Sequence, residues 1–197
     1  MHDNNNSGMN RLLRTAILIA GILTAAICSA QDPDTATAID EYNLIMKSAD
    51  IDPKVVWQTG VRLSNLGEER KARELGKMLL ERANATGDRE KCELYGHMLI
   101  GTVTADSSPI KALESLEKAR AIAESAKNHE ALVSIYNALG IYYLINNNDP
   151  YTAAEYYYNG LEEVKSLGDD RRYGIILANL SGCYQVMNDP SGLRLAE

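Results

Sequence analysis

The chain has 197 residues, of which 45% are hydrophobic and 24% are charged, proportions typical of a globular domain and not of a disordered chain. Its formal net charge is −7, and the first thirty residues carry two arginines and one aspartate, so the remainder is more acidic still. This balance argues against a segment that binds nucleic acid or an anionic membrane through a basic surface.

Residues 1–30 are predicted to be a secretory signal peptide. Two arginines precede an apolar run, 16–28, and the small residues Cys28 and Ala30 occupy the two positions that a signal peptidase reads. The run is shorter than the roughly 20 residues that span a membrane as a helix. We therefore expect cleavage before Gln31 and an exported protein, periplasmic or extracytoplasmic, and an uncleaved anchor is the alternative.

The segment 31–53 is predicted to be a polar lead-in followed by a capping helix. One face of that helix carries the apolar residues Ile39, Tyr42, Ile45 and Met46. Asp52-Pro53 ends this helix, and Pro53 also suits the first turn of the next helix, with Asp52 as its cap.

The remainder of the chain repeats a two-helix pattern with a period of 40 or 41 residues. In the clearest unit, apolar residues recur at i, i+3, i+4 and i+7 in both helices, which a turn at 146–150 separates. Five pairs of residues lie 41 positions apart: Tyr95 and Tyr136, Met98 and Leu139, Ala112 and Ala153, Leu116 and Tyr157, and Ala119 and Gly160. The predicted units are about 54–88, 91–127, 129–168 and 171–197.

The fourth unit is predicted to be incomplete. Its first helix carries several apolar residues, but few residues follow to cover them. A repeat array that ends on an apolar face needs a cap. We therefore expect this chain to be the first part of a longer protein, and the isolated chain either to self-associate or to fray at its C-terminal end.

These repeats resemble the tetratricopeptide repeat family, whose first helix carries an aromatic residue, Leu-Gly and a second aromatic, and whose second helix carries Ala, an aromatic and Ala. The third unit matches best, with Tyr136, Leu139, Gly140, Tyr143, Ala153, Tyr157 and Gly160. The second unit has Leu99, and the fourth Ser181, where the family has Gly. The resemblance covers about 54–197 and implies an all-α, right-handed solenoid of about three and a half antiparallel hairpins, of a long-period type.

The resemblance implies protein binding, because in such repeats the first helices line a concave groove and the second helices form the outer surface. Aligned on Tyr136, the groove positions are Trp57, Val61, His97, Ile100, Asn137, Ile141 and Asn179. We predict a protein or peptide partner there. Trp57 is the predicted aromatic anchor, although a shift of one residue would return it to the core. Asn179 either holds the backbone of a bound peptide or forms a hydrogen bond within the helix layer.

The sequence predicts no catalytic site, no metal site and no cofactor. None of His2, His97 and His129 has a Cys, His or carboxylate at the spacing of a zinc or hydrolase site. Cys92 and Cys183 should lie about 20 Å apart across neighbouring helices, so we expect free or intermolecularly paired thiols.

Adjacent tyrosines at 156–158 suggest a ligand site at first sight. Helical geometry, however, directs one ring to the core and its neighbours to the sides, so core packing is the prediction for this triplet.

Taken together, these patterns predict an exported helical-repeat module that binds protein or relays a signal without catalysis. Repeats that follow a secretory signal resemble the extracytoplasmic sensory part of bacterial membrane-bound regulators. The alternatives are a free secreted or outer-membrane-associated scaffold, and an accessory region of an enzyme whose catalytic part lies outside this chain. We expect this segment to bind no nucleic acid, and to meet a membrane only through the signal or a downstream anchor.

Overall fold

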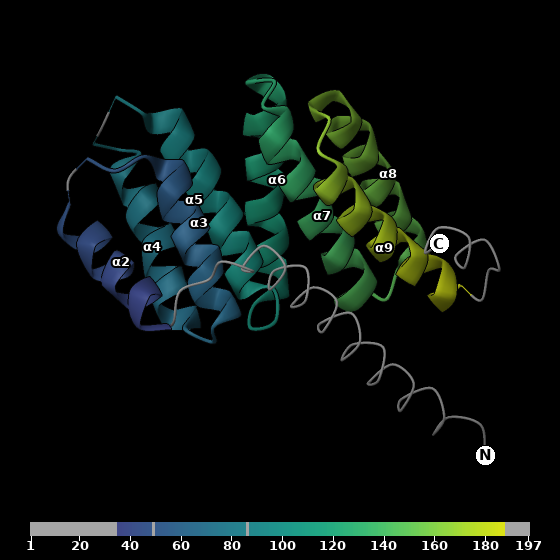
Figure 1. The fold of residues 1–197 in the computed structure, drawn as a ribbon, viewed down its shortest axis with the longest axis horizontal. Helices are drawn as coiled ribbons and strands as arrows, with labels where there is room; N and C mark the ends of the chain where they lie inside the picture. The colour runs from purple at the N-terminus through teal and green to yellow at the C-terminus, as the bar shows by residue number, and fades with distance from the viewer. Residues whose placement is uncertain (1–34, 49, 86, 188–197) are drawn as a thin grey trace, which may run out of the picture. The chain divides into compact units, whose positions relative to one another are not determined.

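The computed structural model describes residues 35–48, 50–85 and 87–187, and this part of the chain is all-helical, without strands. Its eight helices are α2 (Thr35–Lys47), α3 (Pro53–Asn65), α4 (Glu69–Arg82), α5 (Arg89–Thr104), α6 (Pro109–Ser125), α7 (His129–Ile145), α8 (Pro150–Leu167) and α9 (Asp170–Val186) (Figure 1). The predicted all-α class is confirmed. The predicted signal, 1–30, lies outside the described residues. Among the described helices, none is both long enough and apolar enough to cross a membrane.

Helix α2 packs on α3 and α4. Ala38 and Ile45 are buried there, and Ile39 and Tyr42 are half-buried against the core. Met46, predicted on the buried face, is instead 45% exposed. Adjacent residues of a helix point about 100° apart, so once Ile45 is buried its neighbour turns outward.

Helices α3 to α9 pack mainly against their neighbours in the chain and are joined by short turns. We call α3 with α4, α5 with α6, and α7 with α8 the first, second and third pairs. The helices α3, α5, α7 and α9 are the first helices, and α4, α6 and α8 are the second helices. The first helices of the pairs are also neighbours in two places, because α3 packs along α5 and α7 touches α9. Helices α5 and α7, by contrast, share at most a marginal contact. The row of first helices therefore parts between the second and third pairs.

Residues with turn and capping chemistry begin and end these helices. Asp52 caps α3 by accepting a hydrogen bond from the Lys54 backbone N–H at 2.8 Å, as predicted. Asp149 caps α8 in the same way through the Thr152 N–H at 3.1 Å. Gly168 ends α8 with a φ of 64°, a left-handed conformation that glycine adopts without strain.

The tightest packing in the third pair places a tyrosine ring on a glycine. A Cβ at Gly140 would lie 2.6 Å from Tyr157 Cζ, so the ring rests directly on the backbone of α7. Tyr157 is fully buried, Tyr156 is half-buried and Tyr158 is 48% exposed, which confirms the predicted arrangement of the triplet. Burial in this apolar surrounding raises the pKa of Tyr157 well above its ordinary value.

The second pair uses the same kind of contact in a different register. Leu116, which corresponds to Tyr157, packs on Gly101, where a Cβ would lie 2.6 Å from Leu116 Cγ. Leu99, which replaces the glycine of the repeat pattern, lies instead over Gly60 of α3, where a Cβ would lie 2.8 Å from Leu99 Cδ1. The large residue at 99 thus fills space between the first and second pairs.

Gly140→Leu and Ala153→Leu are each expected to lower the free energy of unfolding by more than about 2 kcal/mol, because overpacking a tight core is strongly destabilising. Ala153 is fully buried, and a side chain at Gly140 would collide with the Tyr157 ring. Urea unfolding followed by circular dichroism measures both changes.

Gly174→Ala on α9 is the matched control, because this glycine is exposed and a Cβ added to it would meet no neighbouring atom within 4 Å. It should raise stability by up to about 1 kcal/mol through helix propensity. A Gly140→Leu variant that unfolds together with the parent would contradict this account of the third pair.

Candidate partner-binding face

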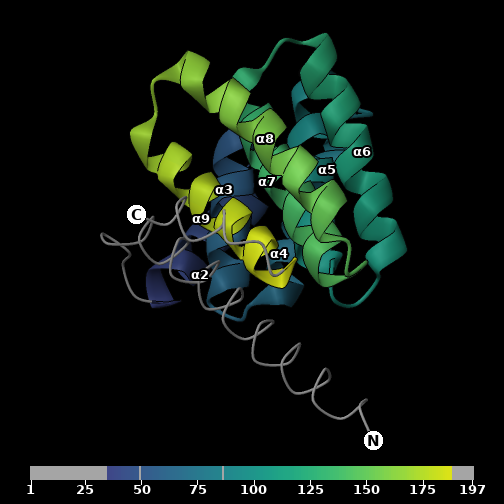
Figure 2. The same cartoon turned by 90° about the vertical axis from the view of Figure 1, so that its right-hand side faces the viewer.

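One carboxylate links three of the first helices. Glu130, in the first turn of α7, accepts hydrogen bonds from Lys54 Nζ at 2.7 Å and from Arg172 Nη2 at 2.9 Å. Lys54 belongs to the first turn of α3 and Arg172 to the first turn of α9. Figure 2 looks along the row of helices, with α9 in front and α3 behind. In the sequence, 76 residues separate Lys54 from Glu130. We call the three side chains the Glu130 clasp, and the side of α3, α7 and α9 that carries them the clasp face.

The two cations lower the pKa of Glu130 below its ordinary value. The hydrogen bond from Lys54 is the largest cause and the one from Arg172 adds to it, while partial burial opposes both. Arg172 also pairs with Asp169 at 3.3 Å, and Asp169 in turn caps α9. The clasp is therefore a small charged network at the N-terminal ends of three helices.

A second link joins α7 and α9 further along the same face. Asn179 Nδ2 donates to Asn137 Oδ1 at 2.8 Å. Asn137, Asn179 and Val61 each lie seven residues after a member of the Glu130 clasp, which places them two helical turns along, about 10.5 Å, on the same sides of their helices. For Asn179, which is only 7% exposed, the structure shows the hydrogen bond within the helix layer that the sequence left open.

Trp57 and Ile141 lie on the clasp face as well. Trp57 is three residues after Lys54, and Ile141 is four residues after Asn137. The indole is half-buried and contacts the Tyr95 ring, with the ring centroids 5.9 Å apart and the planes tilted by 36°. It packs against the edge of the core while part of it meets solvent.

His97 and Ile100 face the second helices instead. A Cβ at Gly76 of α4 would lie 2.8 Å from Ile100 Cδ1. His97 lies near Lys118 of α6, and burial, followed by that charge, lowers its pKa, with Glu93 acting in the opposite direction. The structure therefore separates these two residues from the other five predicted groove positions. The physical reason is the register of α5, since Leu99 turns toward Gly60 and carries its neighbours around the helix with it.

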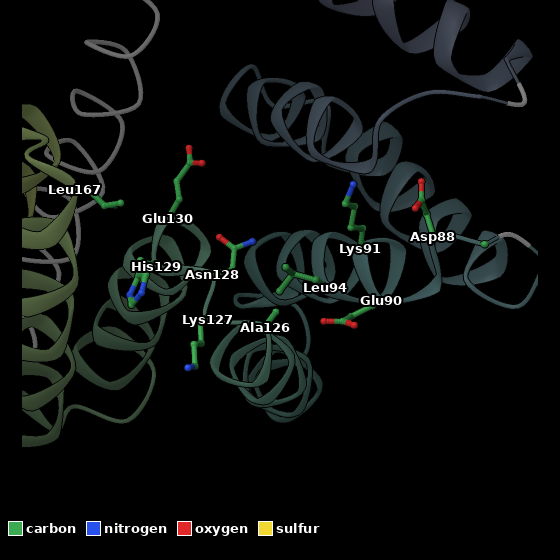
Figure 3. A pocket seen from close by; sticks show the side chains of 11 residues that line it. Asp88, Glu90, Lys91, Leu94, Ala126, Lys127, Asn128, His129, Glu130 and Leu167 are labelled. Atoms are coloured by element: carbon green, nitrogen blue, oxygen red, sulfur yellow. The ribbon is translucent and has the colours of Figure 1, made fainter.

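A hollow of about 640 Å³ opens where α5 and α7 part. Lys91 and Leu94 line it from α5, Asn128 from the turn before α7, Glu130 from α7, and Leu167 from the end of α8. In Figure 3, the Lys91 and Glu130 side chains project toward the same side of the ribbon. The lining carries charges of both signs beside Leu94 and Leu167, so the hollow selects no single class of charged ligand.

The sequence reasoning missed the clasp residues. A signal for two of them exists, because Glu130 and Arg172 are 42 residues apart, the same separation as Asn137 and Asn179. Seven residues before the aligned positions Asn137 and Asn179, the same alignment places the Glu130 carboxylate opposite the Arg172 guanidinium. Lys54 lies seven residues before Val61, so the same step from that predicted groove position reaches it. The pair between His129 Nδ1 and Glu163 Oε2, at 2.6 Å, was also missed.

The side chains of the clasp face offer amide groups, paired charges and apolar edges. Over the ranges 35–48, 50–85 and 87–187, no three His, Cys, Asp or Glu side chains come together as a metal site would require. Cys92 and Cys183 are both buried and not bonded to each other, and burial raises the pKa of the Cys183 thiol to about 12. Comparison with family models, curated proteins and solved structures gives no match.

The depressed pKa of Glu130 predicts an acid-sensitive contribution to stability. The unfolded carboxyl has the ordinary pKa of 4.5 and the folded one a lower pKa, so the clasp stabilises the fold fully above 4.5 and loses this effect as the pH falls through the folded value. Glu130→Gln should remove that part of the acid dependence. Urea unfolding at neutral pH and at a pH below the folded pKa measures it.

Glu162→Gln is the control, because among residues 35–48, 50–85 and 87–187 its carboxylate pairs with Lys165 of its own helix, and its side chain is 74% exposed. It should lose stability in acid as the parent does. A Glu130→Gln variant that loses as much stability in acid as the parent would show that the clasp makes no pH-dependent contribution.

Proposed function

We propose that this chain is an exported helical-repeat module, a right-handed solenoid of the long-period tetratricopeptide kind, that binds a protein or peptide partner on its clasp face. In the setting that the resemblance implies, it is the sensory part of a membrane-anchored regulator. A free exported scaffold is the alternative, and it would use the same face.

Support for a solenoid comes from the order of packing. Pairs of helices joined by short turns follow one another, and α3 packs along α5 as α7 touches α9. In a regular array, such packing exposes one side of the first helices as a continuous surface. The parting of α5 from α7 is a departure from a regular array.

The observation that carries the binding proposal is the alignment of Trp57, Val61, Asn137, Ile141 and Asn179 on the clasp face. A half-buried tryptophan is the kind of residue that anchors a partner. Asn137 is half-exposed and accepts the Asn179 hydrogen bond through its Oδ1. Its Nδ2 can therefore donate to the backbone of an extended or helical peptide.

Binding on this face predicts site-specific crosslinking. A photoreactive amino acid that replaces Val61 or Ile141, which lie on the clasp face and are partly exposed, should trap a partner in cells, whereas the same residue in place of Ile110 should not. Ile110 is apolar and 74% exposed, but it lies in the first turn of the second helix α6. Equal trapping at 61 and 110, or trapping at 110 alone, would place the binding surface elsewhere.

Trp57→Ala combined with Asn179→Ala should weaken capture of the trapped partner while leaving the helical content nearly unchanged. Circular dichroism during heating, run beside a pull-down, separates this from a packing role. A core tryptophan would cost roughly 3–5 kcal/mol of stability when replaced by alanine, and a loss of that size would argue for packing.

Export is proposed on the charged and apolar pattern of residues 1–30. N-terminal sequencing of protein recovered from outside the cytoplasm should give Gln31 as the first residue. A mature protein that retains the segment 18–23 would indicate an uncleaved anchor.

A further inference from the structure

The junction 126–128 divides the described helices into a first group, α2 to α6, and a second group, α7 to α9, and buried residues of α6 and α7 share one hydrophobic core across it. In the first group α3 packs along α5, and in the second α7 packs on α8 and α9. From α3 onward, α6 and α7 have the least extensive contact of any two consecutive helices. The hollow between α5 and α7 lies beside this junction and is lined by residues of both groups.

The junction between the two groups is a short turn. Lys127 adopts a φ of 50°, a left-handed conformation that ends α6, and the Asn128 N–H donates to the Ala123 carbonyl at 2.9 Å. Asn148, between α7 and α8, has a similar φ of 53°. Asn128 then caps α7 through the Ala131 N–H at 3.1 Å. A short turn between two helices is a place where a small change of backbone angles reorients them.

Other hydrogen bonds between the groups involve α6 or the turn that precedes it. The Tyr156 hydroxyl donates to Glu117 of α6 at 3.2 Å, and the Tyr136 hydroxyl donates to Glu124 of α6 at 3.3 Å. Asn146 Nδ2 donates to the Ala105 carbonyl, between α5 and α6, at 3.1 Å. The ion pair between Lys54 and Glu130, in contrast, connects α3 to α7 on the clasp face.

We propose that the Glu130 clasp controls a hinge at 126–128. When Lys54 is released from Glu130, the first group of helices rotates away from the second, so that α3 and α7 move apart on the clasp face beside the hollow. The side chains of Lys54 and Glu130 are 36% and 41% exposed, and ion pairs that water reaches are held only weakly. Loss of either charge, or a competing ion, is then enough to shift the balance between closed and open arrangements. The biological use of this movement rests on the proposed function, but the movement itself does not.

The test measures distances between spin labels in the full chain without any partner, so its failure would leave the binding proposal standing. The three native cysteines are first replaced by alanine, and a thermal melt checks that this background folds. One label pair spans the two groups, at Gln58→Cys on α3 and Asn159→Cys on α8. A second pair stays within the first group, at Gln58→Cys and Glu114→Cys on α6. All three labelled positions are exposed.

Lys54→Gln and Glu130→Gln should each shift the distance across the groups to longer values and broaden it, and leave the distance within the first group unchanged. Arg172→Gln is the matched control, because Arg172 and Glu130 both belong to the second group. It should leave both distances as in the parent. High salt should act on the parent as Lys54→Gln does.

Three results would overturn the proposal. The distance across the groups could stay the same in Lys54→Gln and Glu130→Gln. Arg172→Gln could change it as much as Lys54→Gln does, which would point to loosening of the second group. The distance within the first group could change equally, which would indicate partial unfolding and not hinge motion.

Discussion

The third pair of helices depends on the contact between the Tyr157 ring and the backbone of Gly140. With no side chain at 140, α7 and α8 approach closely enough for a fully buried ring to fill the space between them. A residue as large as tyrosine removes much apolar surface from water. One turn later, Ile176 of α9 packs on Gly160 of α8. A large side chain on a glycine therefore sets the position of the following helix as well.

The second pair shows how this packing of a large side chain on a glycine changes when the glycine is replaced. Leu99 stands where the third pair has glycine, and it cannot lie beneath the residue that corresponds to Tyr157. Gly101 takes over that contact with Leu116, and Leu99 fills the space over Gly60. The resulting register of α5 directs His97 and Ile100 to the second helices. Helices α5 and α7 are separated at the boundary between the second and third pairs, and the hollow lies at this boundary.

Local features of the fold were accessible from the sequence, whereas distant side-chain contacts were not. The helix limits of α7 and α8, the caps at Asp52 and Gly168, and the burial of Tyr157 follow from apolar spacing and turn chemistry acting over a few residues. The rotation of α5 does not, because it depends on how Leu99 competes for space with two different neighbours. The contact between Lys54 and Glu130 joins residues 76 positions apart, and it exists only at one relative orientation of the helix pairs.

Core packing contacts and exposed ion pairs differ in strength, and this difference determines which part of the structure moves first. Overpacking at a contact such as Gly140 with Tyr157 is expected to cost more than about 2 kcal/mol, whereas an exposed ion pair contributes about 0.2–1 kcal/mol and weakens with salt. Conditions that break the clasp therefore leave each pair of helices intact. What changes first is the orientation of one group relative to the other, and with it the spacing between Trp57 on α3 and Asn137 on α7. A partner that contacts both residues would bind one orientation better than the other, and by linkage its binding would change how often the clasp is closed.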